Sequence, residues 1–128
     1  MIKVLLVDDQ PTVLQGLRMR LGLEPDLVVI GEAEDGQAAI DLVGARSPDV
    51  IVLDLEMPGM DGIATAQALR TIAPEGVVII LSIHSDMVAR RRALAAGAVA
   101  FIEKNAGVEP LLAAIRRGRA GAPSTSQE

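Results

Sequence analysis

The chain has 128 residues and a formal net charge of −5 at pH 7, which fits a single domain. Half of its residues are hydrophobic, but Phe101 is the only aromatic residue, so the core has to be aliphatic. The absence of cysteine excludes disulfides and cysteine-bound zinc, the single histidine excludes histidine-rich metal clusters, and the acidic balance argues against a nucleic-acid-binding surface.

Apolar runs alternate with amphipathic segments along the chain, which predicts five strands and five helices. The first run, 2–7, is followed at once by acids and lacks the cleavage site of a signal peptide, so we interpret it as a strand. Helix ends are also marked, with Asp61 and Ser85 as expected caps of the third and fourth helices. Strands are predicted at 2–7, 27–33, 49–54, 77–83 and 98–104, and helices at 11–23, 36–46, 62–72, 86–97 and 107–118.

Strict strand–helix alternation predicts a parallel sheet with right-handed crossovers and helices on both faces. In such sheets, ligands bind beyond the carboxyl ends of the strands. Polar residues stand at these ends: Asp8 and Asp9 after the first strand, Asp54 after the third, Ser82 after the fourth and Lys104 after the fifth. In the order 2-1-3-4-5 these four strands are neighbours, and their polar groups converge.

The converging groups predict a site for phosphoryl chemistry. Carboxylates at Asp8, Asp9 and Asp54 repel one another unless a cation joins them, and hard oxygen ligands suit Mg²⁺. An aspartate beside that ion can act as a nucleophile and become an acyl phosphate. Lys104 supplies a positive charge for a phosphoryl oxygen, and the Ser82 hydroxyl can donate to another.

The segments "LLVDDQ", "VLDLEMPGMDG", "LSIHSD" and "AGAVAFIEK" resemble a response-regulator receiver domain of bacterial two-component signalling. The resemblance implies a doubly wound, flavodoxin-like α/β fold, (βα)5, with five parallel strands in the order 2-1-3-4-5. It implies that Asp54 is the phosphorylated residue, with a sensor histidine kinase as donor. It also implies metal binding by Asp8, Asp9, Asp54 and the Glu56 backbone carbonyl, and catalytic roles for Asp54, Lys104 and Ser82.

In the family that the chain resembles, a hydroxyl and an aromatic residue form a switch, and Ser82 and Phe101 match them. The phosphoryl group is expected to pull Ser82 towards it and to let Phe101 turn inward. The fourth helix, fifth strand and fifth helix would then present a changed face to a partner or to a second copy of the chain. Ile83 is bulkier than the small residue common there, and Glu56 and His84 occupy positions that tune hydrolysis.

Each marked residue also has a plainer interpretation. Asp8 and Asp9 could only cap the first helix, and Phe101 could only fill the core. Three other functions stay open: a degenerate receiver that binds partners without phosphorylation, a small Mg²⁺-dependent aspartyl-phosphate phosphatase, and a flavodoxin-like cofactor carrier. The phosphatase would have a second aspartate where Glu56 stands, and the carrier would need more aromatic residues than Phe101.

We expect residues 1–118 to form the receiver domain and 119–128 a flexible tail or linker. We expect the protein to be a phosphoprotein of phosphorelay signal transduction and not a dedicated enzyme. No apolar run reaches the length of a bilayer span, so a cytoplasmic location without membrane contact is expected. The stretch "GAVAFIEKNAGVEPLLAAI" looks like receivers used in transcription regulation, in which a helix-turn-helix DNA-binding domain follows in the full-length protein.

Overall fold

The computed structural model describes residues 1–57, 62–83 and 86–119 of the chain. The strands are β1 (Ile2–Val7), β2 (Leu27–Ala33), β3 (Val50–Asp54), β4 (Val77–Ser82) and β5 (Ala100–Glu103). The helices are α1 (Pro11–Leu21), α2 (Gly36–Arg46), α3 (Gly62–Ile72), α4 (Met87–Ala95) and α5 (Val108–Arg119), and a short 3-10 turn, η1, covers Lys104–Ala106.

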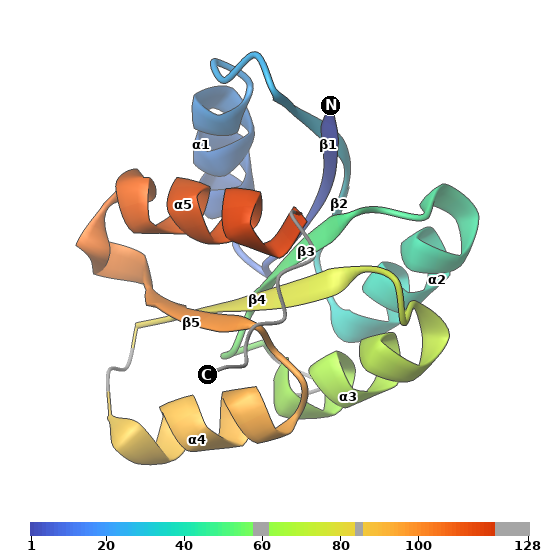
Figure 1. Cartoon of the computed structure of the whole chain (residues 1–128), viewed down its shortest axis with the longest axis vertical. Helices are drawn as coiled ribbons and strands as arrows, with labels where there is room; N and C mark the ends of the chain where they lie inside the picture. The colour runs from blue at the N-terminus through green and yellow to red at the C-terminus, as the bar shows by residue number, and fades with distance from the viewer. Residues whose placement is uncertain (58–61, 84–85, 120–128) are drawn as a thin grey trace.

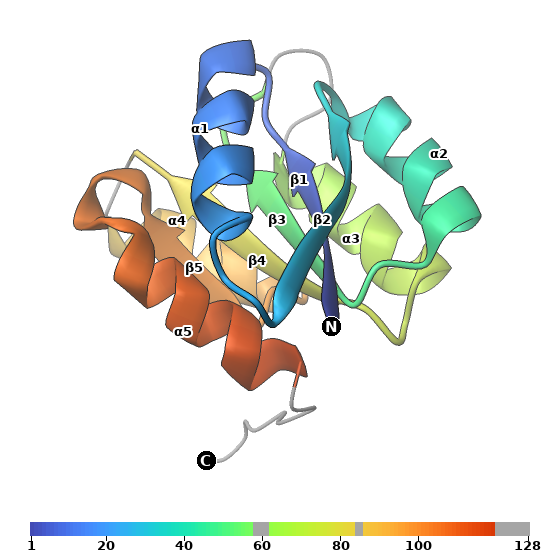
Figure 2. The ribbon, with the colours of Figure 1, turned by 90° about the horizontal axis from the view of Figure 1, so that it is seen from above.

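The strands form one parallel sheet in the order β2-β1-β3-β4-β5, as predicted. Helices α1 and α5 cover one face, and α2, α3 and α4 cover the other (Figure 1). Seen from above, the two helical layers lie on either side of the twisted sheet (Figure 2). The chain is therefore a doubly wound α/β domain.

The core lies in two apolar layers, one on each face of the sheet. The first packs β1, β3 and β4 against α2, α3 and α4, and Phe101 belongs to it. The second packs the opposite faces of the same strands against α1 and α5. All five residues of β3 are buried because it is central and covered on both faces, which explains its unbroken apolar sequence before Asp54.

The helix ends show which capping predictions hold. The prediction that Ser85 caps the fourth helix is wrong: Asp86 is the cap, and its carboxylate accepts from the Ala89 amide at 2.8 Å. Because the cap lies one residue later, α4 starts at Met87. Gly97 follows the end of α4 with a positive φ of 109°, as its type suggested. The predicted cap Asp61 lies outside the described residues.

Helix α5 continues to residue 119, one residue beyond the expected domain boundary. The rest of the predicted tail lies outside the described residues. No helix in the described part of the chain is long and apolar enough to cross a membrane.

Candidate functional site

Strand register brings the predicted polar residues to one edge of the sheet. Asp54, the last residue of β3, pairs with Leu81, so Ser82 stands one residue further along β4. Ser82 in turn pairs with Glu103, which places Lys104 directly beyond the end of β5. Asp8 follows the last residue of β1, the strand on the other side of β3. Four neighbouring strands of the sheet thus bring polar groups to the same edge.

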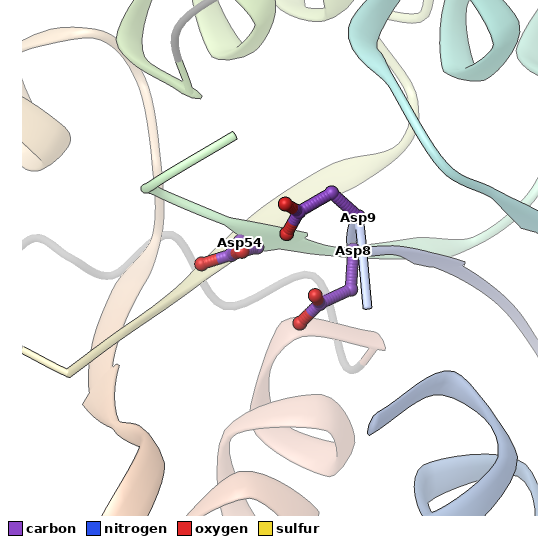
Figure 3. Close-up of side chains that lie close together, drawn as sticks. All are labelled: Asp8, Asp9 and Asp54. Carbon is purple, nitrogen blue, oxygen red and sulfur yellow. The ribbon is translucent and has the colours of Figure 1, made fainter. Parts of the chain in front are cut away.

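The three aspartates gather into one cluster (Figure 3). One carboxylate oxygen from each of Asp8, Asp9 and Asp54 lies within 4.8 Å of the other two. Asp8 and Asp54 are each only 2 % exposed, and Asp9 is half-buried. Asp54 therefore sits at the lip of the sheet but is still largely withdrawn from water.

Lys104 is the cation of this site. Its Nζ lies 3.1 Å from Asp8 Oδ2 and 3.1 Å from Asp54 Oδ1. Asp54 Oδ1 also accepts from the Glu56 amide at 3.2 Å. Burial works against the charge of Lys104, but its contacts with Asp54 and Asp8 outweigh burial and raise its pKa. The ammonium is thus held in its charged form between two acids.

One ammonium does not balance three carboxylates, and the excess negative charge affects the pKa of Asp54. Burial, followed by the charge of Asp8, raises the pKa of Asp54 from 3.8 to about 6, although Lys104 and the Glu56 amide act in the opposite direction. With a pKa of about 6, most of the Asp54 carboxyl is ionised at neutral pH. The site is nevertheless short of positive charge.

The oxygens at this site fit a hard divalent cation. Asp8 Oδ1 accepts from the Gln10 amide at 2.9 Å. The plainer interpretation of Asp8 and Asp9 as caps of the first helix is wrong, because Gln10 is the N-cap of α1 and no side chain caps that helix. Asp8 Oδ2, however, is buried and accepts no hydrogen bond from the described residues, although Lys104 faces it. A buried carboxylate oxygen that accepts no hydrogen bond, beside two further carboxylates, suits Mg²⁺.

Ser82 is fully buried at the end of β4, and its hydroxyl donates to Glu56 Oε2 at 2.6 Å. The Ile83 amide donates to the other oxygen of the same carboxylate, Oε1, at 3.4 Å. Sequence reasoning assigned the backbone carbonyl of Glu56 to metal binding and its position to the tuning of hydrolysis, but it missed this contact of the side chain with Ser82. The signal was an acid two residues after Asp54, in a loop that faces a predicted serine.

Phe101, the residue matched to the aromatic switch position, lies in the first core layer and is only 6 % exposed. The guanidinium carbon of Arg90, on α4, lies 6.0 Å from the centre of the ring. The ring is therefore buried in this unmodified protein, with a cation of α4 near it.

Helix α3 approaches the site very closely at its first residue. A Cβ atom at Gly62 would lie 2.7 Å from the Cα and carbonyl oxygen of Leu55, which directly follows Asp54. Gly62 also donates its amide to that carbonyl at 3.1 Å. Only glycine fits there, because any side chain would push the helix away from the end of β3.

The profile of the response regulator receiver domain matches residues 4–116. The chain belongs to this family. The nitrate/nitrite response regulator protein NarL of Escherichia coli is 36% identical over 118 residues, which are 92% of this chain and 55% of that protein. The transcriptional regulatory protein LiaR of Bacillus subtilis is 41% identical over 125 residues, 96% of this chain and 58% of LiaR.

Among solved structures, the signal receiver domain of NarL from Mycobacterium tuberculosis matches with a TM-score of 0.82 and 35% identity, over 90% of this chain and 96% of that one. The family and the fold inferred from the four sequence segments are therefore confirmed. This receiver domain spans about half the length of NarL and LiaR.

The structure brings the predicted site residues together with two qualifications. Asp8, Asp9, Asp54 and Lys104 form one cluster, whereas Ser82 is joined to it through Glu56. Phe101 lies in the core layer below α4, beside Arg90, and the interactions described join it to none of the four residues of this cluster. His84, the other residue expected to tune hydrolysis, lies outside the described residues.

Proposed function

We propose that this receiver domain is a phosphorylation-dependent switch that accepts a phosphoryl group on Asp54 from a sensor histidine kinase. The observation that carries the proposal is the buried, ionisable carboxylate of Asp54 at the meeting point of Asp8, Asp9 and Lys104. Such a group is placed for attack and surrounded by the charges that phosphoryl transfer needs.

In the proposed reaction, a carboxylate oxygen of Asp54 attacks the phosphorus of the donor. The new oxygen–phosphorus bond makes an acyl phosphate, while the bond from phosphorus to the donor imidazole nitrogen breaks and that nitrogen keeps the electron pair. Lys104 already lies 3.1 Å from Asp54 Oδ1 and can follow the negative charge onto a phosphoryl oxygen. Asp8, Asp9, Asp54 and the Glu56 carbonyl would hold Mg²⁺, which when bound supplies charge neutralisation of the phosphoryl group.

Modification of Asp54 is proposed to change the face formed by α4, β5 and α5. Helix α4 is the element best suited to move, because Ala93 is its only buried residue. Leu94, on α4, is 43% exposed, and Val99, just before β5, is 46% exposed. Both side chains offer apolar surface to a partner or to a second copy of the chain.

The relatives also suggest an output. NarL and LiaR are response or transcriptional regulators, and this chain matches about half of each. We propose that it is the regulatory part of a transcription regulator whose DNA-binding domain lies elsewhere in the full-length protein. In that arrangement this chain is a cytoplasmic switch rather than a dedicated enzyme, and it does not bind DNA itself.

The chemistry is tested by intact mass spectrometry after incubation with acetyl phosphate, with and without Mg²⁺. We expect one phosphoryl adduct that requires Mg²⁺ and is lost in Asp54→Asn. Asp41→Asn is the matched control, since Asp41 is an exposed carboxylate on α2. Absence of any adduct in the wild-type protein, with Mg²⁺ binding demonstrated, would favour a receiver that works without phosphorylation.

The face is tested by sedimentation of the phosphorylated protein. We expect a dimer on phosphorylation and its loss in Leu94→Asp. Leu23→Asp is the control, because Leu23 is exposed at 74% but lies beyond the end of α1. If the control variant loses the dimer and Leu94→Asp keeps it, the partner surface is not the α4 face.

A further inference from the structure

The Glu56 side chain occupies the two hydrogen-bond donors that stand beside Asp54 at the end of β4. The Ser82 hydroxyl lies 2.6 Å from Oε2, and the Ile83 amide lies 3.4 Å from Oε1. The shorter contact has the length of a hydrogen bond between a hydroxyl and an ionised carboxylate. A carboxylate of this chain thus sits where two donors would receive an external anion.

These donors cannot serve two acceptors equally well at once. A serine hydroxyl has one proton to donate, and a backbone amide has one. Ser82 is completely buried, so its hydroxyl cannot exchange Glu56 for bulk water. A phosphoryl oxygen on Asp54 therefore gains the Ser82 proton only when Glu56 gives it up.

Glu56 is also tied to Asp54 through its own backbone. The Glu56 amide donates to Asp54 Oδ1 at 3.2 Å, so the Glu56 backbone stays beside the acceptor residue. The side chain is the part that can leave. A phosphoryl group adds about 1.5 to 2 negative charges at this place, and its repulsion acts on the Glu56 carboxylate at short range.

We propose that the Glu56 carboxylate is a built-in competitor of the phosphoryl group for Ser82 and the Ile83 amide. It holds Ser82 in position while Asp54 is unmodified, and it has to be displaced before Ser82 contacts a phosphoryl oxygen. Glu56 is therefore a positioning residue that sets how strongly the modified state is favoured. The inference rests on the proposed function of Asp54 and adds a group of the same chain that competes with the phosphoryl group.

The competition is measured as the affinity for beryllofluoride, an acyl-phosphate mimic, in the presence of Mg²⁺. Hydrogen bonds to charged groups contribute enough that their release should tighten binding roughly tenfold in Glu56→Gln and Glu56→Ala. Glu34→Gln is the matched control: it removes the same charge from an exposed acid at the same edge of the sheet, beyond β2, and should leave the affinity unchanged.

The role of Ser82 is isolated by repeating Glu56→Ala in a Ser82→Ala background. If the competition runs through the hydroxyl, the gain should shrink to less than about threefold there. In the unmodified protein, the amide resonance of Ile83 should move in Glu56→Gln but not in Glu34→Gln. That shift reports the contact without any phosphoryl chemistry.

The outcomes separate the two proposals. Wild-type affinity in both Glu56 variants overturns the competition, as does a gain that is equally large without Ser82 or in Glu34→Gln. An Ile83 resonance that does not respond to Glu56→Gln overturns the contact itself. A wild-type protein that binds Mg²⁺ but neither beryllofluoride nor a phosphoryl group overturns the proposed function, and the competition falls with it.

Discussion

Two ionic clusters lie at opposite ends of the sheet, and they are built in opposite ways. At the carboxyl end, Lys104 contacts Asp8 and Asp54, Asp9 lies close to both, and the described residues supply no second cation there. Asp8 and Asp54 are almost completely buried. At the amino end, Nε of Arg116 on α5 lies 2.8 Å from Oδ2 of Asp26, the residue just before β2. Only in the first cluster is an excess of acids held largely away from water.

In the second cluster, Arg20 and Arg116 face Glu24, Asp26 and Glu109, and solvent reaches all of these side chains. Arg116 Nη2 also lies 2.7 Å from Glu24 Oε1, and Arg20 Nη1 lies 2.7 Å from Glu24 Oε2. Hydrogen bonds from the arginines lower the pKa values of Glu24 and Asp26, whereas burial raises that of Asp54. The comparison teaches that charged clusters in a receiver domain differ in role. The amino-end cluster links α5 to the loop before β2 through ion pairs, whereas the carboxyl-end cluster has an excess of negative charge that suits a cation.

The largest effect is expected on removing Lys104, the one cation that the described part of the chain places in the buried cluster. Lys104→Met leaves Asp8 and Asp54 buried without a partner, and we expect the free energy of unfolding to fall by about 3 to 4 kcal/mol at about pH 8. The loss should be smaller at about pH 5, where the acids can take up protons. Urea unfolding at the two pH values measures it, and an equal loss at both would show that packing, not charge, is responsible.

Removing an acid should have the opposite sign. Asp54 has a pKa of about 6 in the folded protein and 3.8 ordinarily, so the folded state binds the proton more tightly. Its contribution to stability is therefore full below about pH 4 and is lost as the pH rises through about 6. Metal-free Asp54→Asn should gain about 2 to 3 kcal/mol over the wild type at about pH 8.

Asp41→Asn serves as the control for this pH series, because Asp41 is exposed. Parallel loss of stability from about pH 4 to pH 7 in Asp54→Asn and the wild type would contradict the assignment of this loss to Asp54.

Mg²⁺ should satisfy the charge demand of the carboxyl-end cluster. At about ten times its Kd, the ion should stabilise the wild-type protein by about 1.4 kcal/mol, since it binds only the folded state. Asp8→Asn should lose most of this effect, because Asp8 contributes the buried oxygen without a hydrogen bond. Thermal unfolding with added Mg²⁺ measures the gain, and equal stabilisation of both proteins would place the ion elsewhere.

The smallest effect is expected at the amino end. Arg116→Gln removes contacts that are exposed to solvent, so the midpoint of urea unfolding should fall slightly at low ionic strength. In about 1 M salt, where the screening length is about 3 Å, the difference should vanish. A difference that persists in high salt would mean that Arg116 acts through side-chain packing and not through charge.

Local patterns allowed much of the fold to be predicted from the sequence. The bounds of β1, β2, α2 and α3 agree with those expected, because apolar runs and caps such as Asp35 act over a few residues. The capping prediction at Ser85 failed since Asp86, the next residue, is an equally good cap by type. Local chemistry alone does not decide between two adjacent caps.

The site shows the same division. The gathering of Asp8, Asp54 and Lys104 followed from strand order, which brings strand ends together whatever the side-chain rotamers are. The contact of Glu56 with Ser82 joins residues 26 positions apart and depends on where one side chain turns in a loop. Arg116 and Asp26 are 90 positions apart, and no local pattern in the sequence pairs them.

The close approach of Gly62 to Leu55 fixes α3 against the end of β3, whereas α4 on the other side of the site is held less tightly. With no room even for a methyl group between α3 and the end of β3, a displacement at Asp54 cannot be absorbed by sliding along α3. On the opposite side, α4 is attached mainly through Ala93 and small neighbours. On the proposed phosphorylation of Asp54, Gly62 would therefore keep α3 in place, and the structural change would be transmitted to the surface through α4 alone.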